Sequence, residues 1–186
     1  MNNHRNNRLW LLAGMALILV ILPLVVSGCI RLGDIGPVPV DVVMVDNELF
    51  FVLEKEYEIN DVWVFVSNPD ARGKMEKVMW ALSHDKSTKV ETRKYPRLKQ
   101  IKYGQRFEEF TFVIEPLELQ RNVEYSVAIN MGPKFAKETF IITSDNKVIM
   151  PDPVFERQKN RTYSVSIDEN GNKILVPEPI SNGEVK

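Results

Sequence analysis

From Val40 onward, apolar and polar residues alternate with the period of β-strands. Residues 123–130, VEYSVAIN, alternate large apolar residues with polar or small ones, as a strand with one buried face does. Residues 110–114, FTFVI, have the same period, whereas residues 62–66, VWVFV, are apolar on both faces and predict a central strand. No window of helical period longer than about ten residues competes with this pattern. Short strands separated by turns therefore predict an all-β protein, an antiparallel sandwich or barrel.

Several further segments are predicted as strands. They are residues 42–45, 49–53, 78–82, 98–103 and 139–143. Asp46 and Asn47 stand between the first two and predict a tight hairpin turn. Trp63 and Trp80 lie on predicted strands, and we expect both to be core residues of the two sheets.

The C-terminal part carries one pattern twice. Residues 139–153 and 162–179 each predict a hairpin whose second strand ends in Pro-acid-Pro. The second hairpin contains Asn170-Gly171, the strongest hairpin-turn signal in the chain. Prolines cannot donate to a β-ladder, so each motif stops its hairpin from recruiting further strands. We expect the second hairpin to be an extension of the sandwich and residues 180–186 to be a frayed end.

The N-terminal segment has a different pattern. Leu9–Val26 is an uncharged run of 18 residues, and a helix that spans a membrane needs about 17–25 apolar residues. Residues 1–8, MNNHRNNR, are positively charged and contain no acid, as in the n-region of a secretory signal. Small residues follow the apolar run, as at a cleavage site. These flanks favour a signal peptide over an uncleaved signal anchor.

Residues 26–29, Val-Ser-Gly-Cys, resemble the bacterial lipobox, an aliphatic residue and two small residues before an obligatory cysteine. The resemblance implies that the Cys29 thiol receives a diacylglycerol, that cleavage falls between Gly28 and Cys29, and that the new amino group is acylated too. Each buried methylene contributes about 0.8 kcal/mol, so two or three chains make a stable membrane anchor. Ile30, not aspartate, follows the cysteine, which by the family rule implies the outer membrane, facing the periplasm.

These features predict the organisation of the chain. The segments are a lipoprotein signal peptide (residues 1–28), a lipidated tether (29–39), a β-sandwich domain (40–150), and a hairpin extension with a flexible tail (151–186). The tether is predicted because residues 30–39, IRLGDIGPVP, contain two glycines and two prolines without periodicity. The exported part is long enough for one domain with a real core.

Residues 119–129, LQRNVEYSVAI, resemble the tyrosine corner of fibronectin type III and other immunoglobulin-like domains. Leu119 stands six residues before Tyr125, which opens an alternating strand. In these domains the ring packs at the end of the sandwich and its hydroxyl bonds the backbone a few residues upstream. Arg121 and Asn122 replace the usual proline and glycine, so the turn is less rigidly encoded. The resemblance implies an immunoglobulin-like antiparallel β-sandwich and indicates no activity.

Composition and charge argue against several functions. The net charge is −1, and removal of the leader also removes Arg5 and Arg8, so nothing predicts nucleic-acid binding. Cys29 is the only cysteine, which leaves no partner for an internal disulfide. Zinc needs several histidines or cysteines, and the glycines do not gather in a phosphate-binding loop. We expect no metal, no cofactor beyond the lipid on Cys29 and no small-molecule substrate.

A search for catalytic residues finds one local cluster. His84 is the only histidine after the leader, and Ser83, Asp85 and Ser87 lie near it. A hydrolytic triad needs a nucleophile, a base and an orienting group, but this cluster follows a strand in a polar stretch, which favours a solvated turn. Carboxylate pairs such as Glu108-Glu109 are typical of the polar faces of strands or turns. We therefore predict no catalytic residue, and an envelope hydrolase is the least favoured function.

Residues 86–102, KSTKVETRKYPRLKQIK, carry seven basic residues and one acid. The candidate partner-binding residues are Lys89, Arg93, Lys94, Tyr95, Arg97 and Lys99. A patch of this kind steers acidic partners, here an acidic protein surface or anionic glycans and lipids of the envelope. The alternative, which charge patterning favours, is a solvated loop and edge strand whose lysines discourage aggregation.

Several short segments carry a second resemblance. They are residues 80–82, 101–104 leading into 107–110, 117–119 with 125–127, and 140–143. The set looks like a group of small proteobacterial lipoproteins described as immunity proteins against type VI secretion effectors, over Cys29 to about Met150. It implies a non-catalytic periplasmic protein that binds and neutralises a toxin, and it transfers no site residue beyond Cys29. The alternative is a structural lipoprotein that anchors an envelope or secretion complex.

Overall fold

The computed structural model describes residues 36–67, 77–84, 89, 93–155 and 161–178. The predicted signal peptide, the cleavage position at Gly28 and the lipidation residue Cys29 lie outside these residues. Within them the protein is all-β, with strands and no helix. The described ranges accordingly contain no helix with the length and apolar character to cross a membrane.

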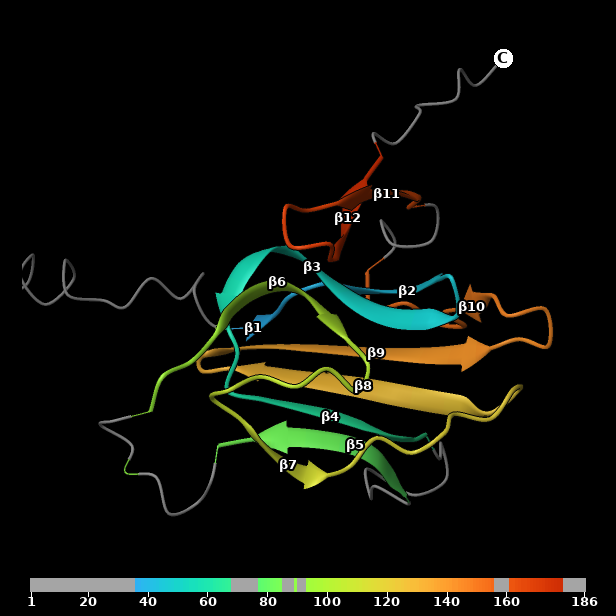
Figure 1. Ribbon diagram of the computed structural model, residues 1–186. Helices are drawn as coiled ribbons and strands as arrows, with labels where there is room; N and C mark the ends of the chain where they lie inside the picture. Colours follow the sequence, from blue (N-terminus) through green and yellow to red (C-terminus); the bar gives the residue numbers. More distant parts are fainter. Residues whose placement is uncertain (1–35, 68–76, 85–88, 90–92, 156–160, 179–186) are drawn as a thin grey trace, which may run out of the picture. The chain divides into compact units, whose positions relative to one another are not determined.

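The larger sheet has seven strands in the order β1-β9-β8-β4-β5-β7, with β10 also paired to β9 (Figure 1). These strands are β1 (Gly36–Pro37), β4 (Asp61–Val66), β5 (Val78–Ser83), β7 (Thr111–Ile114), β8 (Glu124–Met131), β9 (Lys134–Ile142) and β10 (Val148–Ile149). All neighbours are antiparallel except β1 and β9. The segment predicted to be central forms β4, between β5 and β8.

The smaller sheet has three strands in the order β2-β3-β6. They are β2 (Val40–Val45), β3 (Glu48–Glu58) and β6 (Arg97–Lys102). Asp46 and Asn47 join β2 to β3 with positive φ angles of 49° and 66°, the left-handed conformation that a type I′ hairpin turn requires. The hairpin predicted at these residues is therefore confirmed.

The core lies between the two sheets and receives side chains from both. Its fully buried members include Phe51, Leu53, Ile59, Val62, Val64, Trp80, Leu82, Ile101, Tyr125, Val127 and Phe140. Trp80 of the larger sheet stacks on Phe51 of the smaller sheet, with ring centroids 6.5 Å apart. Aromatic pairs of this kind add to the stabilisation from apolar burial. Trp80 is thus a core residue, as predicted.

Trp63 is not a core residue, which corrects the expectation from the sequence. Val62 and Val64 face the core, so the alternation of the strand turns Trp63 to the outer face, where it is half-buried. There it stands between Ala81 of β5 and Ala128 of β8 in the strand register. Its Nε1 donates a hydrogen bond to Asp61 at 3.0 Å. The indole therefore covers small residues on the outside of the sheet.

The tyrosine corner is present. The Tyr125 side chain is buried, and its hydroxyl accepts a hydrogen bond from the Gln120 backbone N–H at 2.8 Å. Asn122 takes the left-handed conformation (φ 58°) where glycine is usual, and its N–H donates to the Ile142 carbonyl at 2.7 Å. Together with the two facing antiparallel sheets, this motif is compatible with an immunoglobulin-like sandwich.

Both predicted C-terminal hairpins are confirmed. β9 and β10 form the first, and β11 (Tyr163–Ile167) and β12 (Lys173–Pro177) form the second, with Gly171 in its turn at φ 81°. The second hairpin packs on the outer face of the three-stranded sheet. Leu175 is buried there against Phe50 and Val52, which alternate along β3 with residues of the main core.

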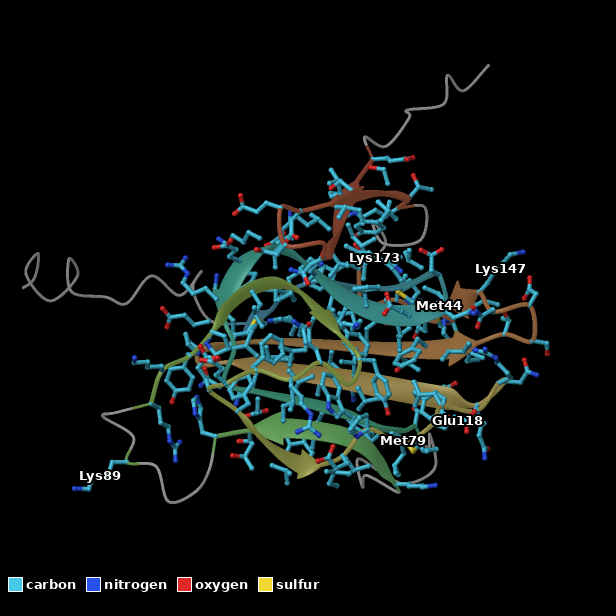
Figure 2. All side chains as sticks on the ribbon, in the orientation of Figure 1. Met44, Met79, Lys89, Glu118, Lys147 and Lys173 are labelled. Atoms are coloured by element: carbon cyan, nitrogen blue, oxygen red, sulfur yellow. The ribbon has the colours of Figure 1, made fainter. Side chains whose placement is uncertain are left out.

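Ion pairs also hold this hairpin to the sheet. Arg161 pairs with the buried Asp41 of β2 at 2.8 Å, and the Tyr163 hydroxyl donates to the same carboxylate oxygen. On β12, Lys173 (labelled in Figure 2) pairs with Glu48 at 2.9 Å and with Asp46 at 3.0 Å. The hairpin is therefore fixed to the sheet by one small apolar cluster and three ion pairs.

Candidate functional site

The predicted partner-binding residues lie on β6 and on the segment that leads into it. Arg97 and Lys99 are exposed on β6, and Lys94 is exposed just before the strand. Arg93 and Tyr95 are half-buried in the same segment. Lys89, labelled in Figure 2, is exposed but separated from Arg93 by residues outside the described ranges. Since β6 is an edge strand, this basic stretch borders a sheet on one side only.

His84 is buried, which corrects the expectation of a solvated turn. It directly follows β5, and only 8% of its surface is exposed. Its ring lies edge-on to Tyr95 at 4.8 Å and to Phe110 at 5.0 Å. The fold therefore packs the histidine against Tyr95 of the basic segment. Two of the residues considered near it, Asp85 and Ser87, lie outside the described residues.

The surroundings of His84 disfavour the protonated imidazole. Burial lowers the pKa of His84 below its usual 6.5, and the nearby Arg93 cation lowers it further. A hydrogen bond to the Glu109 backbone and the Glu109 carboxylate act in the opposite direction. The buried Nε2 has no hydrogen-bond partner among the described residues. No described hydroxyl is therefore held by this nitrogen as a Ser–His nucleophile would be, and the ring serves as an aromatic support for Tyr95.

The basic segment is less continuous than its sequence suggests. Lys102, at the end of β6, turns to the Glu48 carboxylate at 3.1 Å, which it shares with Lys173. The hydrogen bonds from Lys173 and Lys102 lower the pKa of Glu48, and the one from Lys173 has the larger effect. Lys102 thus belongs to the docking of the C-terminal hairpin and not to a partner surface.

Three cations of the segment keep their charge available. Lys94, Arg97 and Lys99 form no ion pair with any residue in the part of the chain that the structure describes. Glu58 stands opposite Arg97 in the strand register, but the two side chains are not paired. We use the name β6 surface for Arg93, Lys94, Tyr95, Arg97 and Lys99, with His84 packed against Tyr95 and Phe110 packed against His84.

A hollow of about 320 Å³ adjoins the β6 surface through Phe110. It is lined by Leu82, Arg106, Phe107, Phe110, Thr111 and Glu115. Phe107 and Phe110 meet edge-to-face at 6.0 Å, and the exposed Arg106–Glu115 ion pair spans 3.4 Å. This hollow was not predicted from the sequence, although two phenylalanines three residues apart beside an arginine could have indicated it. An aromatic-lined hollow beside the basic β6 surface can receive an apolar side chain of an acidic partner.

A second groove, of about 490 Å³, lies at the end of the sandwich near the tyrosine corner. Its lining includes Met44 and Glu118, both labelled in Figure 2, with Tyr103, Leu119 and Arg121. Burial raises the pKa of Tyr103, whose hydroxyl donates to the Leu117 carbonyl at 2.7 Å, so this phenol stays protonated. The groove has no arrangement of nucleophile and base and was not predicted from the sequence.

Metal binding receives no support from the described ranges. They contain no group of three or more His, Cys, Asp or Glu residues that could hold a metal ion. No protein-family model, curated protein or solved structure matches this chain. The fold and the chemistry of the β6 surface are therefore the observations that bear on function.

Proposed function

We propose that this protein is a lipid-anchored periplasmic binding module that captures an acidic protein through the β6 surface. The observation that carries the proposal is the position of Tyr95. Its ring is fixed against the buried His84 and flanked by the unpaired cations Lys94 and Arg97. Because the ring is already ordered, little conformational entropy is lost when a partner covers it.

The unpaired cations supply attraction at longer range. Lys94, Arg97 and Lys99 lie in one short stretch, so their fields add and steer an acidic surface toward Tyr95. Lysines on an edge strand also discourage strand-to-strand aggregation. That role needs positive charge only, whereas partner binding needs the aromatic ring as well, so variants of Tyr95 distinguish the two.

The proposed partner is a toxin delivered by type VI secretion, and the protein would be its immunity protein. Support comes from the resemblance of the segments between residues 80 and 143 to immunity lipoproteins and from the lipobox that ends at Cys29. In this proposal the lipid holds the module at the outer membrane, where an incoming toxin arrives. The module acts by covering the toxin and catalyses no reaction.

Growth of cells that export the product of the adjacent reading frame to the periplasm tests this function. The native protein should restore growth, and Cys29→Ser should weaken rescue because the tether is lost. Tyr95→Ala and the double variant Lys94→Glu with Arg97→Glu should abolish rescue, whereas Lys137→Glu, an exposed charge reversal on β9, should not. Absence of toxicity in cells without this protein would overturn the immunity role and favour the anchoring role.

A further inference from the structure

The outer edge of β11 presents unpaired backbone groups. At the two ends of the hairpin, the Glu178 N–H donates to the Thr162 carbonyl and the Asp168 N–H donates to the Asn172 carbonyl. Hydrogen-bonded pairs alternate along an antiparallel ladder, so the N–H and C=O groups of Tyr163, Val165 and Ile167 point away from β12. In the described ranges β11 pairs with β12 alone.

The opposite edge of the hairpin is closed by the chain itself. The Gln100 side chain donates to the Lys173 carbonyl and accepts from the Leu175 N–H at 2.9 Å. It thereby satisfies the outward groups of β12 in the way a neighbouring strand would. Lys173 and Pro177 at the ends of β12 further discourage pairing there.

Within the described residues, β11 lacks three of the usual protections of an edge strand: a charge, a proline and a bulge. Its sequence, YSVSI, contains no charge and no proline, and its register with β12 has no bulge. Apolar side chains are exposed on both faces of the hairpin, Val165 (44%) and Ile167 (61%) on one, Ile174 (39%) and Val176 (45%) on the other. Exposed apolar residues gathered in this way mark an interaction surface.

We propose that β11 pairs antiparallel with β11 of a second copy of this protein, around a two-fold axis at Val165. The segment YSVSI reads almost the same in both directions, so the axis sets Val165 opposite Val165 and Ser164 opposite Ser166. It also sets Tyr163 opposite Ile167, an aromatic and β-branched pair that stabilises adjacent strands. The outward backbone groups of both copies are then paired in one four-stranded sheet.

This self-complementarity is the reason to choose a second copy over another protein. A two-fold axis makes the contact isologous, so the assembly closes at two copies. A strand of this length buries less than the roughly 1,200 Å² of a stable interface. The dimer is therefore expected to be weak in solution and to form where copies are concentrated. The inference uses a surface separate from the β6 surface and does not depend on the proposed function.

Cysteine crosslinking in the full-length chain tests the pairing. Residues in a hydrogen-bonded antiparallel pair have Cα atoms about 5.5 Å apart, within the roughly 4.4–6.8 Å of a disulfide. Val165→Cys should therefore give a covalent homodimer on mild oxidation of whole cells that express it. The unmodified chain, which keeps Cys29, and Ile149→Cys, a similarly exposed position on β10 (51%), are the controls and should give none.

A second set of variants tests the register. Ser164→Cys alone should not crosslink, because the two-fold axis makes its copies diagonal neighbours about 7–8 Å apart. Differently tagged Ser164→Cys and Ser166→Cys chains in one cell should crosslink to each other. These serines are exposed, so their substitution by cysteine preserves the fold. Val165→Pro should abolish this crosslink, because it removes an outward N–H and leaves the bonds between β11 and β12 in place.

Each outcome is decisive. Crosslinking of the serine pair that Val165→Pro prevents supports the proposal. Equal dimer from Ile149→Cys, or dimer from Ser164→Cys alone, would overturn the register. A covalent product that joins Val165→Cys to a different protein, with no homodimer, would overturn the choice of a second copy.

Discussion

The buried ion pair between Asp41 and Arg161 is predicted to hold the C-terminal hairpin on the three-stranded sheet. The Asp41 side chain is 3% exposed and that of Arg161 is 18% exposed, with 2.8 Å between Nη1 and Oδ2. The Tyr163 hydroxyl donates to the same oxygen, while Oδ1 is buried without a partner among the described residues. Arg161→Met would leave this carboxylate buried with one neutral donor.

The magnitude follows from the burial. Removal of one partner of a buried pair costs about 3–5 kcal/mol, because the other charge stays out of water. The donor that Tyr163 retains and the partial exposure of Arg161 place the expected loss at the low end, about 3 kcal/mol. The double variant Asp41→Asn with Arg161→Met removes both charges and keeps an acceptor for Tyr163, so it should be more stable than Arg161→Met alone.

Denaturant unfolding and hydrogen exchange of the β11 and β12 amides measure this effect. Exchange in the hairpin should accelerate more than exchange in β8, because the pair lies at the hairpin's contact with the sheet. Lys147→Met is the matched control, since its pair with Asp145 is exposed on both sides and should contribute nothing measurable. A loss below about 1 kcal/mol in Arg161→Met, or a double variant no better than the single one, would refute the reasoning.

Three further predictions concern other parts of the fold. Tyr125→Phe should lower the free energy of unfolding by about 1 kcal/mol, since the Gln120 N–H loses its acceptor; an unchanged urea midpoint would contradict this role. The lowered pKa of His84 means that the unfolded chain binds more protons below about pH 6.5. The free energy of unfolding should therefore fall as the pH drops below that value. In His84→Phe the melting temperature should depend less on pH below about pH 6.5. If the melting temperature of this variant depends on pH as that of the native protein does, His84 is not the source of the pH dependence. Leu175→Ala should cost about 2–5 kcal/mol of hairpin docking and expose the hairpin to limited proteolysis, while Ile174→Ala, at an exposed neighbouring position, should not.

Most strands and the local turns of this protein could be predicted from the amino-acid sequence alone. A run apolar on both faces predicted β4, and alternation predicted β8. The Asn170-Gly171 pair predicted the last hairpin, and the pattern around Tyr125 predicted the corner. These features depend on residues close together in the chain. Their periodicity and turn chemistry are therefore visible without the fold.

Which side chains meet across the fold could not be predicted without the three-dimensional packing. It turned Trp63 outward and buried His84 against Tyr95. It also drew Lys102 away from the basic segment to Glu48 and set Gln100 against the edge of β12. The contacts of Lys102 and Gln100 join strands far apart in sequence, and the partner of each depends on sheet order and register. Burial and available charge, the two properties on which the β6 surface and the β11 edge depend, follow from that packing and not from local pattern.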